Sequence, residues 1–218
     1  MRLMTRTGSA FVLAAGGLFA TALPSQAAAP TTAVAPPGAD SRCAPANWYG
    51  TDAANTYQGS GGAEYLDGLG GADTIYGGMG SDYICGGDGN DTTYGQAGAD
   101  FEYGGAGNDR QNGGPGADTQ YGDAGADTQY GEAGADTQYG GAGDDAQYGG
   151  PGSDTQYGNN GDDTQYGDAG GDRMYGGAGS DRLYGGAGAD SIDGGPGYDY
   201  CYGGAGNDTF VNCEYTEQ

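Results

Sequence analysis

The sequence predicts an all-β solenoid, a rod made by stacking many short strands joined by tight turns. One nine-residue pattern, Gly-x-x-Gly-x-Asp-x-x-x, repeats seventeen times without a gap from residue 59 to residue 211. Glycine fills the first and fourth positions of every copy, where its missing β-carbon permits backbone angles that other residues avoid. We therefore expect the first six residues of each copy to turn and the last three to form a strand.

The composition sets a condition on this fold. The chain has 52 Gly and 30 Asp and Glu against six Arg and no His, which gives a net charge of −24. Such a composition is typical of disordered chains, because little apolar surface offsets a backbone entropy of about 1–2 kcal/mol per residue. The strict repeat nevertheless favours a folded rod, provided that something neutralises the carboxylates.

The first 29 residues are interpreted as a secretory signal peptide. Arg2 and Arg6 form the charged start, and the apolar run at residues 10–23 is too short to span a membrane. Small residues at 25–29 supply a cleavage site. We therefore predict a secreted, extracellular chain without a membrane span. Its four remaining Arg against 30 acids would give a net charge of −26.

The rest of the chain divides into four segments. Residues 30–40 are predicted to be a disordered linker rich in Ala, Pro and Thr, and residues 41–58 an N-terminal cap. Within this cap, residues 50–58 look like a decayed repeat with Asn55 at the Asp position. Residues 59–211 form the repeat block and residues 212–218 a C-terminal cap, since the terminal repeats of solenoids are atypical.

Position six of the repeat carries a carboxylate in every copy, which predicts a regular set of metal ligands. Ca²⁺ is a hard cation that takes oxygen ligands, whereas softer metals prefer Cys or His. His is absent, and the Cys residues do not recur with the repeat. The predicted calcium ligands are Glu64, Asp73, Asp82, Asp91, Asp100, Asp109, Asp118, Asp127, Asp136, Asp145, Asp154, Asp163, Asp172, Asp181, Asp190, Asp199 and Asp208.

Copies such as residues 77–85 (GGMGSDYIC) and 176–184 (GGAGSDRLY) resemble the RTX, or hemolysin-type, calcium-binding repeat family. The resemblance implies a parallel β-roll with two nonapeptide repeats per coil and Ca²⁺ held between stacked turns on both edges. Ions between copies i and i+2 would number about fifteen for seventeen copies. Their charge would nearly balance that of the chain, so we expect metal binding and folding to be one event.

Position eight, which faces the interior of the roll in that family, is apolar only near the two ends of the repeat block. Seven central copies carry Gln there, from Gln111 to Gln165. Either these amides point inward and hydrogen-bond along the rod, or the Tyr residues at position nine point inward instead. We favour inward Gln, because strand alternation then keeps the register of the apolar copies. Glu102 at the same position is expected to be a solvated local distortion rather than a buried acid with a raised pKa.

Position nine is Tyr in twelve copies, so inward Gln would leave tyrosine stripes on the outer faces. We favour a structural role, in which the rings stiffen each sheet by cross-strand packing. The alternative is that the stripes stack on sugar rings, which would make the chain a carbohydrate- or cell-wall-binding module. Nucleic acid is not an expected partner of so anionic a surface.

The four Cys residues are predicted to form two disulfides, each stapling one cap. In a roll with two repeats per coil, Cys85 and Cys201 lie about six coils apart, roughly 30 Å at one strand spacing per coil. Bridged Cα atoms lie within about 7 Å of each other. The pairing without an end-to-end bridge is Cys43 with Cys85 and Cys201 with Cys213.

The sequence does not favour an enzyme. Without His, the chain has no Ser-His or Cys-His nucleophile system, and nothing distinguishes one pair of repeated Asp residues from its neighbours. The leading hypothesis is a secreted calcium-ion-binding repeat protein. It would fold on Ca²⁺ binding outside the cell and have a structural or adhesive extracellular role.

Overall fold

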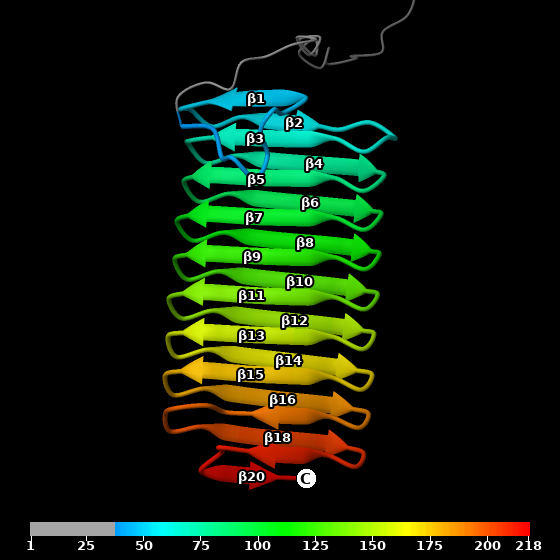
Figure 1. Ribbon diagram of the computed structural model, residues 1–218, viewed down its shortest axis with the longest axis vertical. Coiled ribbons are helices and arrows are strands. Elements are labelled where there is room, and N and C mark those ends of the chain that lie inside the picture. The colour runs from blue at the N-terminus through cyan, green and yellow to red at the C-terminus, as the bar shows by residue number, and fades with distance from the viewer. Residues whose placement is uncertain (1–37) are drawn as a thin grey trace, which may run out of the picture.

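The computed structural model describes residues 38–218, which form a straight rod of two ten-stranded β-sheets (Figure 1). No helix occurs among these residues. The chain alternates between the two sheets, so that each coil of the rod contributes one strand to each sheet. The predicted signal peptide and most of the predicted linker fall at residues 1–37, outside the described residues.

One sheet holds the odd-numbered strands β1 (Trp48–Thr51), β3 (Tyr65–Leu69), β5 (Tyr83–Asp88), β7 (Phe101–Ala106), β9 (Thr119–Ala124), β11 (Thr137–Ala142), β13 (Thr155–Asn160), β15 (Arg173–Ala178), β17 (Ser191–Asp193) and β19 (Thr209–Val211). The other sheet holds the even-numbered strands β2 (Thr56–Gln58), β4 (Thr74–Met79), β6 (Thr92–Ala97), β8 (Arg110–Pro115), β10 (Thr128–Ala133), β12 (Ala146–Pro151), β14 (Thr164–Ala169), β16 (Arg182–Ala187), β18 (Tyr200–Ala205) and β20 (Tyr215–Glu217).

Strand pairing is parallel throughout, which confirms the predicted parallel roll. Through the regular part of the rod, each residue pairs with the residue eighteen positions later, as Tyr121 does with Tyr139. Eighteen residues are two repeats, so equal positions of the repeat stack in straight columns along the rod. Every column therefore carries residues from one position of the repeat, and the chemistry of the rod can be described column by column.

The strands are longer than the sequence predicts. In the regular coils they cover six residues, positions seven to nine of one copy and one to three of the next, as in Thr119–Ala124. Backbone pairing continues beyond this point, since the Gly125 amide donates to the Ala142 carbonyl at 2.9 Å. Position two, where Asp123 has φ 73°, bends the strand in a left-handed conformation that Gly, Asp and Asn tolerate best.

The interior confirms that Gln faces inward. All seven Gln side chains at position eight are fully buried. The Gln129 amide donates to the Gln111 side-chain oxygen at 2.8 Å and to the Tyr139 carbonyl at 3.0 Å. Burying an amide without such partners would be unfavourable, so the ladder of amides accounts for a polar core.

Apolar side chains replace the amides near both ends of the rod. Leu66, Ile75 and Ile84 form one buried cluster. The other cluster contains Met174, Leu183, Ile192 and Cys201. The interior is therefore apolar at both ends and amide-rich in the middle.

Glu102 does not follow the expectation of a solvated distortion. Its side chain is completely buried at the start of the odd-sheet amide ladder, where it accepts a hydrogen bond from the Gln120 amide at 2.8 Å. Glu and Gln have the same shape, so the acid fits the column without disturbing it. Burial in this interior raises the pKa of Glu102 to about 8.

The tyrosines at position nine lie on the outer faces and stack along the rod. The ring centroids of Tyr121 and Tyr139 are 4.7 Å apart with an angle of 3° between the ring planes. Each ring in the middle of such a stack contacts a neighbour on both faces. The rings therefore pack against one another across strands, which supports the structural interpretation of the stripes.

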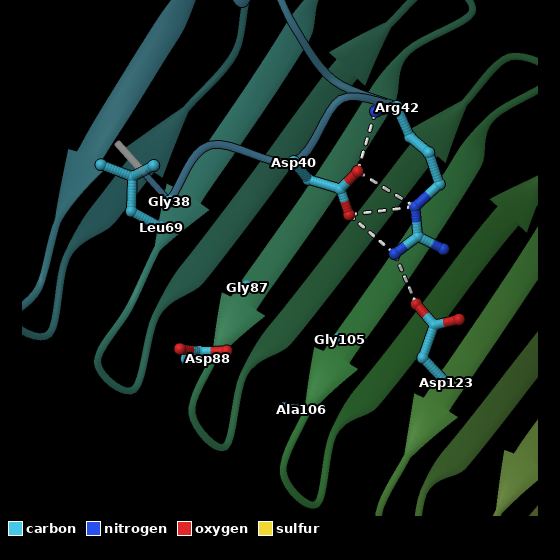
Figure 2. A pocket seen from close by; sticks show the side chains of 9 residues that line it. All are labelled: Gly38, Asp40, Arg42, Leu69, Gly87, Asp88, Gly105, Ala106 and Asp123. Atoms are coloured by element: carbon cyan, nitrogen blue, oxygen red, sulfur yellow. Dashed lines mark hydrogen bonds and ion pairs between the residues drawn. The ribbon is translucent and has the colours of Figure 1, made fainter. Parts of the chain in front are cut away.

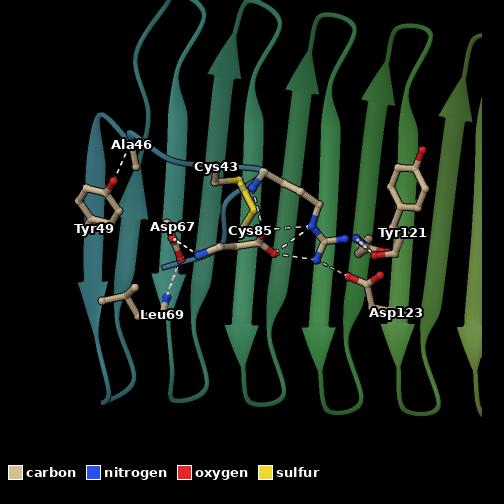
Figure 3. Close-up of a disulfide and its surroundings, with 11 residues drawn as sticks. Cys43, Ala46, Tyr49, Asp67, Leu69, Cys85, Tyr121 and Asp123 are labelled. Atoms are coloured by element: carbon tan, nitrogen blue, oxygen red, sulfur yellow. Dashed lines mark hydrogen bonds and ion pairs between the residues drawn. A yellow bond between two sulfur atoms is a disulfide. The ribbon is translucent and has the colours of Figure 1, made fainter. Parts of the chain in front are cut away.

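Two disulfides lie near the ends of the rod and have the predicted pairing. Cys43 joins Cys85 with Cα atoms 6.2 Å apart, and Cys201 joins Cys213 at 6.1 Å. The first bond ties residues 38–47, which we call the N-terminal strap, to the outer face of the odd sheet (Figure 3).

We predict that Glu102→Gln stabilises the calcium-loaded protein by about 2–4 kcal/mol at pH 7.5. The pKa of Glu102 in the fold lies above that of the unfolded chain. The stability that protonated Glu102 contributes to the fold is therefore fully present below about pH 4.5 and is lost as pH rises toward 8. Urea unfolding should show a large gain at pH 7.5 and almost none at pH 4.5.

Gln138→Glu is the reciprocal variant, because it places an acid in the middle of the same ladder, where the Gln138 amide donates to the Gln120 side-chain oxygen at 2.9 Å. It should be less stable than the wild type, and the loss should become larger as pH rises, because the added buried acid has to ionise. Equal unfolding midpoints of wild type and Glu102→Gln at both pH values would contradict a buried, proton-binding Glu102.

Candidate metal centre

Two columns of carboxylates run along the two edges of the rod, one at each set of turns. Turns that lead from odd to even strands carry Asp73, Asp91, Asp109, Asp127, Asp145, Asp163, Asp181 and Asp199. Turns that lead from even to odd strands carry Glu64, Asp82, Asp100, Asp118, Asp136, Asp154, Asp172, Asp190 and Asp208. The structure thus separates the predicted ligands into two straight sets, with neighbours one coil apart.

One oxygen of each buried Asp links two coils. The backbone N–H of Asp118 donates to Oδ1 of Asp136 at 2.8 Å, and the same bond recurs every eighteen residues. The first column starts at Asn55, whose N–H donates to Asp73, and ends at Glu214, which accepts from the Asp199 N–H at 2.7 Å. Each carboxylate therefore fixes the turn of the preceding coil and is itself held in one orientation.

The other oxygen has no partner. Oδ2 of all sixteen position-six Asp residues is buried and accepts no hydrogen bond. A buried acceptor without a partner costs about 1–3 kcal/mol, and more where the group is charged. Sixteen such atoms in equivalent places are too many to be packing defects, so the column requires a cation or protons.

The glycine at position one leaves room beside this oxygen. A β-carbon on Gly95 would lie 2.5 Å from Oδ2 of Asp100 and 2.7 Å from the carbonyl oxygen of Gly113, one coil further along. No position-one glycine among residues 38–218 has a positive φ. The expectation that this glycine relieves a backbone angle is therefore wrong: it permits close approach of two oxygens.

The glycine at position four is needed both for its backbone angle and for close approach to the preceding coil. Gly98 has φ 158°, and a β-carbon there would lie 1.4 Å from the carbonyl oxygen of Gly80 in the preceding coil. Consecutive turns therefore stack backbone on backbone. This contact brings carbonyl oxygens of successive coils close to the carboxylate column.

Electrostatics at the turns oppose ionisation in the absence of a cation. Burial is the largest cause of a raised pKa at these Asp residues. Neighbouring carboxylates raise the pKa further, and the hydrogen bond from the backbone N–H lowers it. The pKa is raised to about 7 at Asp109, Asp118, Asp145, Asp154 and Asp163. The pKa is raised to about 6 at Asp73, Asp82, Asp127, Asp136, Asp172 and Asp181.

The donor set fits Ca²⁺. The polar atoms nearest the space beside position one are oxygens, which come from an Asp carboxylate and, in most copies, from a backbone carbonyl one coil further along. Within residues 38–218 no three acidic or cysteine side chains gather into one cluster. Each ion would therefore depend on backbone oxygens as much as on side chains, which the flexible coordination of Ca²⁺ allows.

Two end residues differ from the regular column. Oε2 of Glu64 accepts the Ser60 N–H at 2.8 Å, so this carboxylate already has a partner. Oδ1 of Asn55 also lies beside position one, 2.5 Å from where a β-carbon on Gly50 would be, but it accepts the Thr51 N–H at 2.7 Å and so has a partner. Glu214 was not expected, because β20 pairs with β18 at a spacing of fifteen residues and the nine-residue period no longer marks it.

The comparisons with known proteins concern the repeat. The family model described as RTX calcium-binding nonapeptide repeat (4 copies) matches the chain in segments that run from residue 49 to residue 210. No curated protein matches the chain. Within the described part of the chain, no helix is long and apolar enough to cross a membrane.

We predict that the calcium-free protein forms its β-structure at acidic pH and loses it at neutral pH. The folded-state pKa values of the Asp columns lie above the unfolded value of 3.8. The ion-free fold is therefore most stable below about pH 4 and loses stability as pH rises to about 7. Far-UV circular dichroism of metal-free protein between pH 4 and 8 measures this directly.

Glu102→Gln should move this transition to higher pH without abolishing it, since it removes one buried acid and leaves the Asp columns intact. An undiminished β signal at pH 8 without Ca²⁺ would contradict the role assigned to the buried carboxylates.

Proposed function

The chain belongs to the RTX calcium-binding nonapeptide repeat family, and from this premise we propose that it is a secreted protein that folds as it binds Ca²⁺. The observation that carries the proposal is the partnerless Oδ2 atom at sixteen successive turns. Bound Ca²⁺ would supply positive charge to these oxygens. Metal binding and folding then share one free energy.

The proposed ligands are the seventeen position-six carboxylates from Glu64 to Asp208, together with turn carbonyl oxygens. In the regular coils, Oδ1 is engaged by the preceding coil and Oδ2 is available to the ion. Glu64 is the weakest member of the set, because Ser60 already donates to its carboxylate. We expect its site to fill last or to remain empty.

The number of ions is proposed to be about fifteen, one between each pair of stacked turns. Fifteen divalent cations would nearly cancel the net charge of −26 that follows removal of Arg2 and Arg6. The repulsion that disfavours the ion-free rod at neutral pH would then disappear.

The proposed location is outside the cell. Two disulfides indicate an oxidising environment, and the proposed signal peptide at residues 1–29 would direct the chain there. Extracellular modules bind Ca²⁺ with dissociation constants of about 10⁻⁴–10⁻³ M, which suits a protein that folds on arrival. We propose residues 30–40 as a linker, 41–58 and 212–218 as caps, and 59–211 as the calcium-binding roll.

The RTX β-solenoid is a structural, non-catalytic fold, and we propose a structural or adhesive role for this one. A carbohydrate-binding face receives no support from the tyrosine stripes. Rings such as Tyr139 have a neighbouring ring on each face, at 4.7 Å and 4.8 Å. Stacking on sugars would require aromatic faces that are open to solvent.

The primary test is a Ca²⁺ titration of metal-free protein at pH 7.5, followed by far-UV circular dichroism and by calorimetric counting of bound ions. We expect a cooperative rise of β signal at sub-millimolar to millimolar Ca²⁺ and about fifteen ions per chain. Mg²⁺ should not replace Ca²⁺, because it requires compact octahedral coordination. Full β structure in chelator at this pH would refute metal-dependent folding.

A second prediction assigns the ligands. Asp136→Asn keeps the oxygen that accepts the Asp118 N–H but replaces the partnerless oxygen with NH₂. At neutral pH we expect it to stabilise the ion-free protein, because one buried charge is removed. We also expect it to raise the Ca²⁺ midpoint by about twofold to tenfold.

Asp168→Asn is the matched control: it makes the same charge change at an exposed position-two residue, where φ is 67° and Asn is well tolerated. It should leave the Ca²⁺ midpoint almost unchanged. Equal effects of the two substitutions would mean that overall charge, rather than ligation at Asp136, determines calcium affinity.

A further inference from the structure

The long tyrosine stacks have ends, and the structure shows what covers most of them. In the odd sheet, five rings stack in one column, with centroid spacings of 4.7–5.0 Å: Tyr103, Tyr121, Tyr139, Tyr157 and Tyr175. In the even sheet, four rings do the same: Tyr130, Tyr148, Tyr166 and Tyr184. Each stack leaves one ring face uncovered by its own column at each end.

Both N-terminal ends are covered by a guanidinium group. The column that ends at Tyr103 continues with Cys85 instead of a ring, and Arg42 of the strap lies over Tyr103 at 4.2 Å from the ring centroid. The column that ends at Tyr130 continues with Asn112, and Arg110 lies over Tyr130 at the same distance. Guanidinium groups favour such faces through cation–π attraction.

Arg42 also forms ion pairs with carboxylates next to the ring that it covers. Its Nη2 is 2.7 Å from Oδ2 of Asp123, on the strand beyond Tyr103, and 2.7 Å from Oδ2 of Asp40 (Figure 2). Asp40, Arg42 and Asp123 are among the residues that line a pocket between the strap and the odd sheet. A ring face with a carboxylate beside it is therefore a guanidinium site that this fold already uses.

The C-terminal end of the odd stack also has a ring face next to a carboxylate, which here stands at position nine of the following coil instead of position two. Tyr175 is the most exposed ring of its column, at 37 %. Its neighbour one coil further along is Asp193. In the described part of the chain, no ring and no Arg lies on this face of Tyr175. In the even stack, by contrast, tilted rings of Tyr200 and Tyr202 lie beyond Tyr184.

Charge at this end of the rod favours a cation. Asp193 is half-buried, and Oδ1 accepts the Asn212 side-chain amide at 2.9 Å, which fixes the carboxylate. Asp193 is not one of the proposed calcium ligands, so its negative charge beside Tyr175 remains when Ca²⁺ is bound. The other open stack ends lack a carboxylate in the column; Phe101, for example, is followed by Thr119.

We propose that the open face of Tyr175 and the carboxylate of Asp193 form a docking site for an arginine side chain of a partner protein. The guanidinium group lies over the ring, as Arg42 lies over Tyr103, and donates to the oxygens of Asp193. A lysine ammonium is a poorer fit, because it neither stacks in a plane nor forms a bidentate contact. The proposal concerns the outer face and is independent of calcium ligation at the edges.

The test is a titration of calcium-saturated protein, with ¹³C-labelled tyrosine rings, by the blocked peptide Gly-Arg-Gly. We expect the Tyr175 resonances, assigned with Tyr175→Ser, to shift, whereas those of Tyr103 stay in place because Arg42 covers that ring. The matched Gly-Lys-Gly peptide should bind about threefold more weakly, and a citrulline peptide, which lacks the charge, should not bind.

Asp193→Asn tests the carboxylate and keeps the contact with Asn212 through its remaining oxygen. We expect it to weaken the arginine peptide about threefold or more, while circular dichroism with Ca²⁺ stays that of the wild type. Unmoved Tyr175 resonances, or equal binding of the arginine and lysine peptides, would overturn the proposal. Unchanged affinity in Asp193→Asn would do the same. A failure of calcium-dependent folding would appear in the circular dichroism instead. The docking site and calcium-dependent folding are therefore tested by separate measurements.

Discussion

The rod depends on how its two columns of buried carboxylates are compensated. Every regular coil places one Asp at each edge, and the turn leaves one of its oxygens without a hydrogen-bond donor. A protein interior does not hold so many unpaired charges, because each must lose its water. Protons or cations must therefore accompany folding. The repeated glycines bring backbone carbonyls to the same place, which makes an oxygen-preferring cation the better of these two solutions at neutral pH.

The interior follows a related logic with neutral groups. Gln side chains satisfy one another only along an unbroken column, since each amide donates to the one a coil before it and to a carbonyl of the opposite sheet. Where the column stops, at Gln156 and Gln165, the side-chain oxygen has no donor. Glu102 ends the odd column at the other side. Its carboxylate accepts the hydrogen bond of the Gln120 amide, and it has no amide of its own that would need an acceptor from Ile84, the next residue in the column. A ladder of this kind stabilises long rods and contributes little to short ones.

Much of this architecture follows from the nine-residue period. The period aligns the Asp residues in columns, places Gln and Tyr on opposite faces, and leaves one feasible pairing of the cysteines. What it misses depends on contacts between coils. The left-handed angle at position two, as at Asp123, arises from how six-residue strands stack, and the burial of Glu102 from the amide that meets it. Arg42 belongs to no repeat, so only the folded chain brings it to Tyr103.

The ends of the rod explain why its sequence is not uniform. A coil in the middle has neighbours on both sides, and each of its ladders is continued by hydrogen bonds or stacked rings. A terminal coil has one neighbour, so an amide or ring there would lose half of its contacts. Apolar side chains need no directed partner, and Leu66 and Leu183 lie where the amide ladders have ended. A disulfide beside each apolar cluster adds a covalent restraint where the ladders cannot act, which leaves the polar columns to the coils that can complete them.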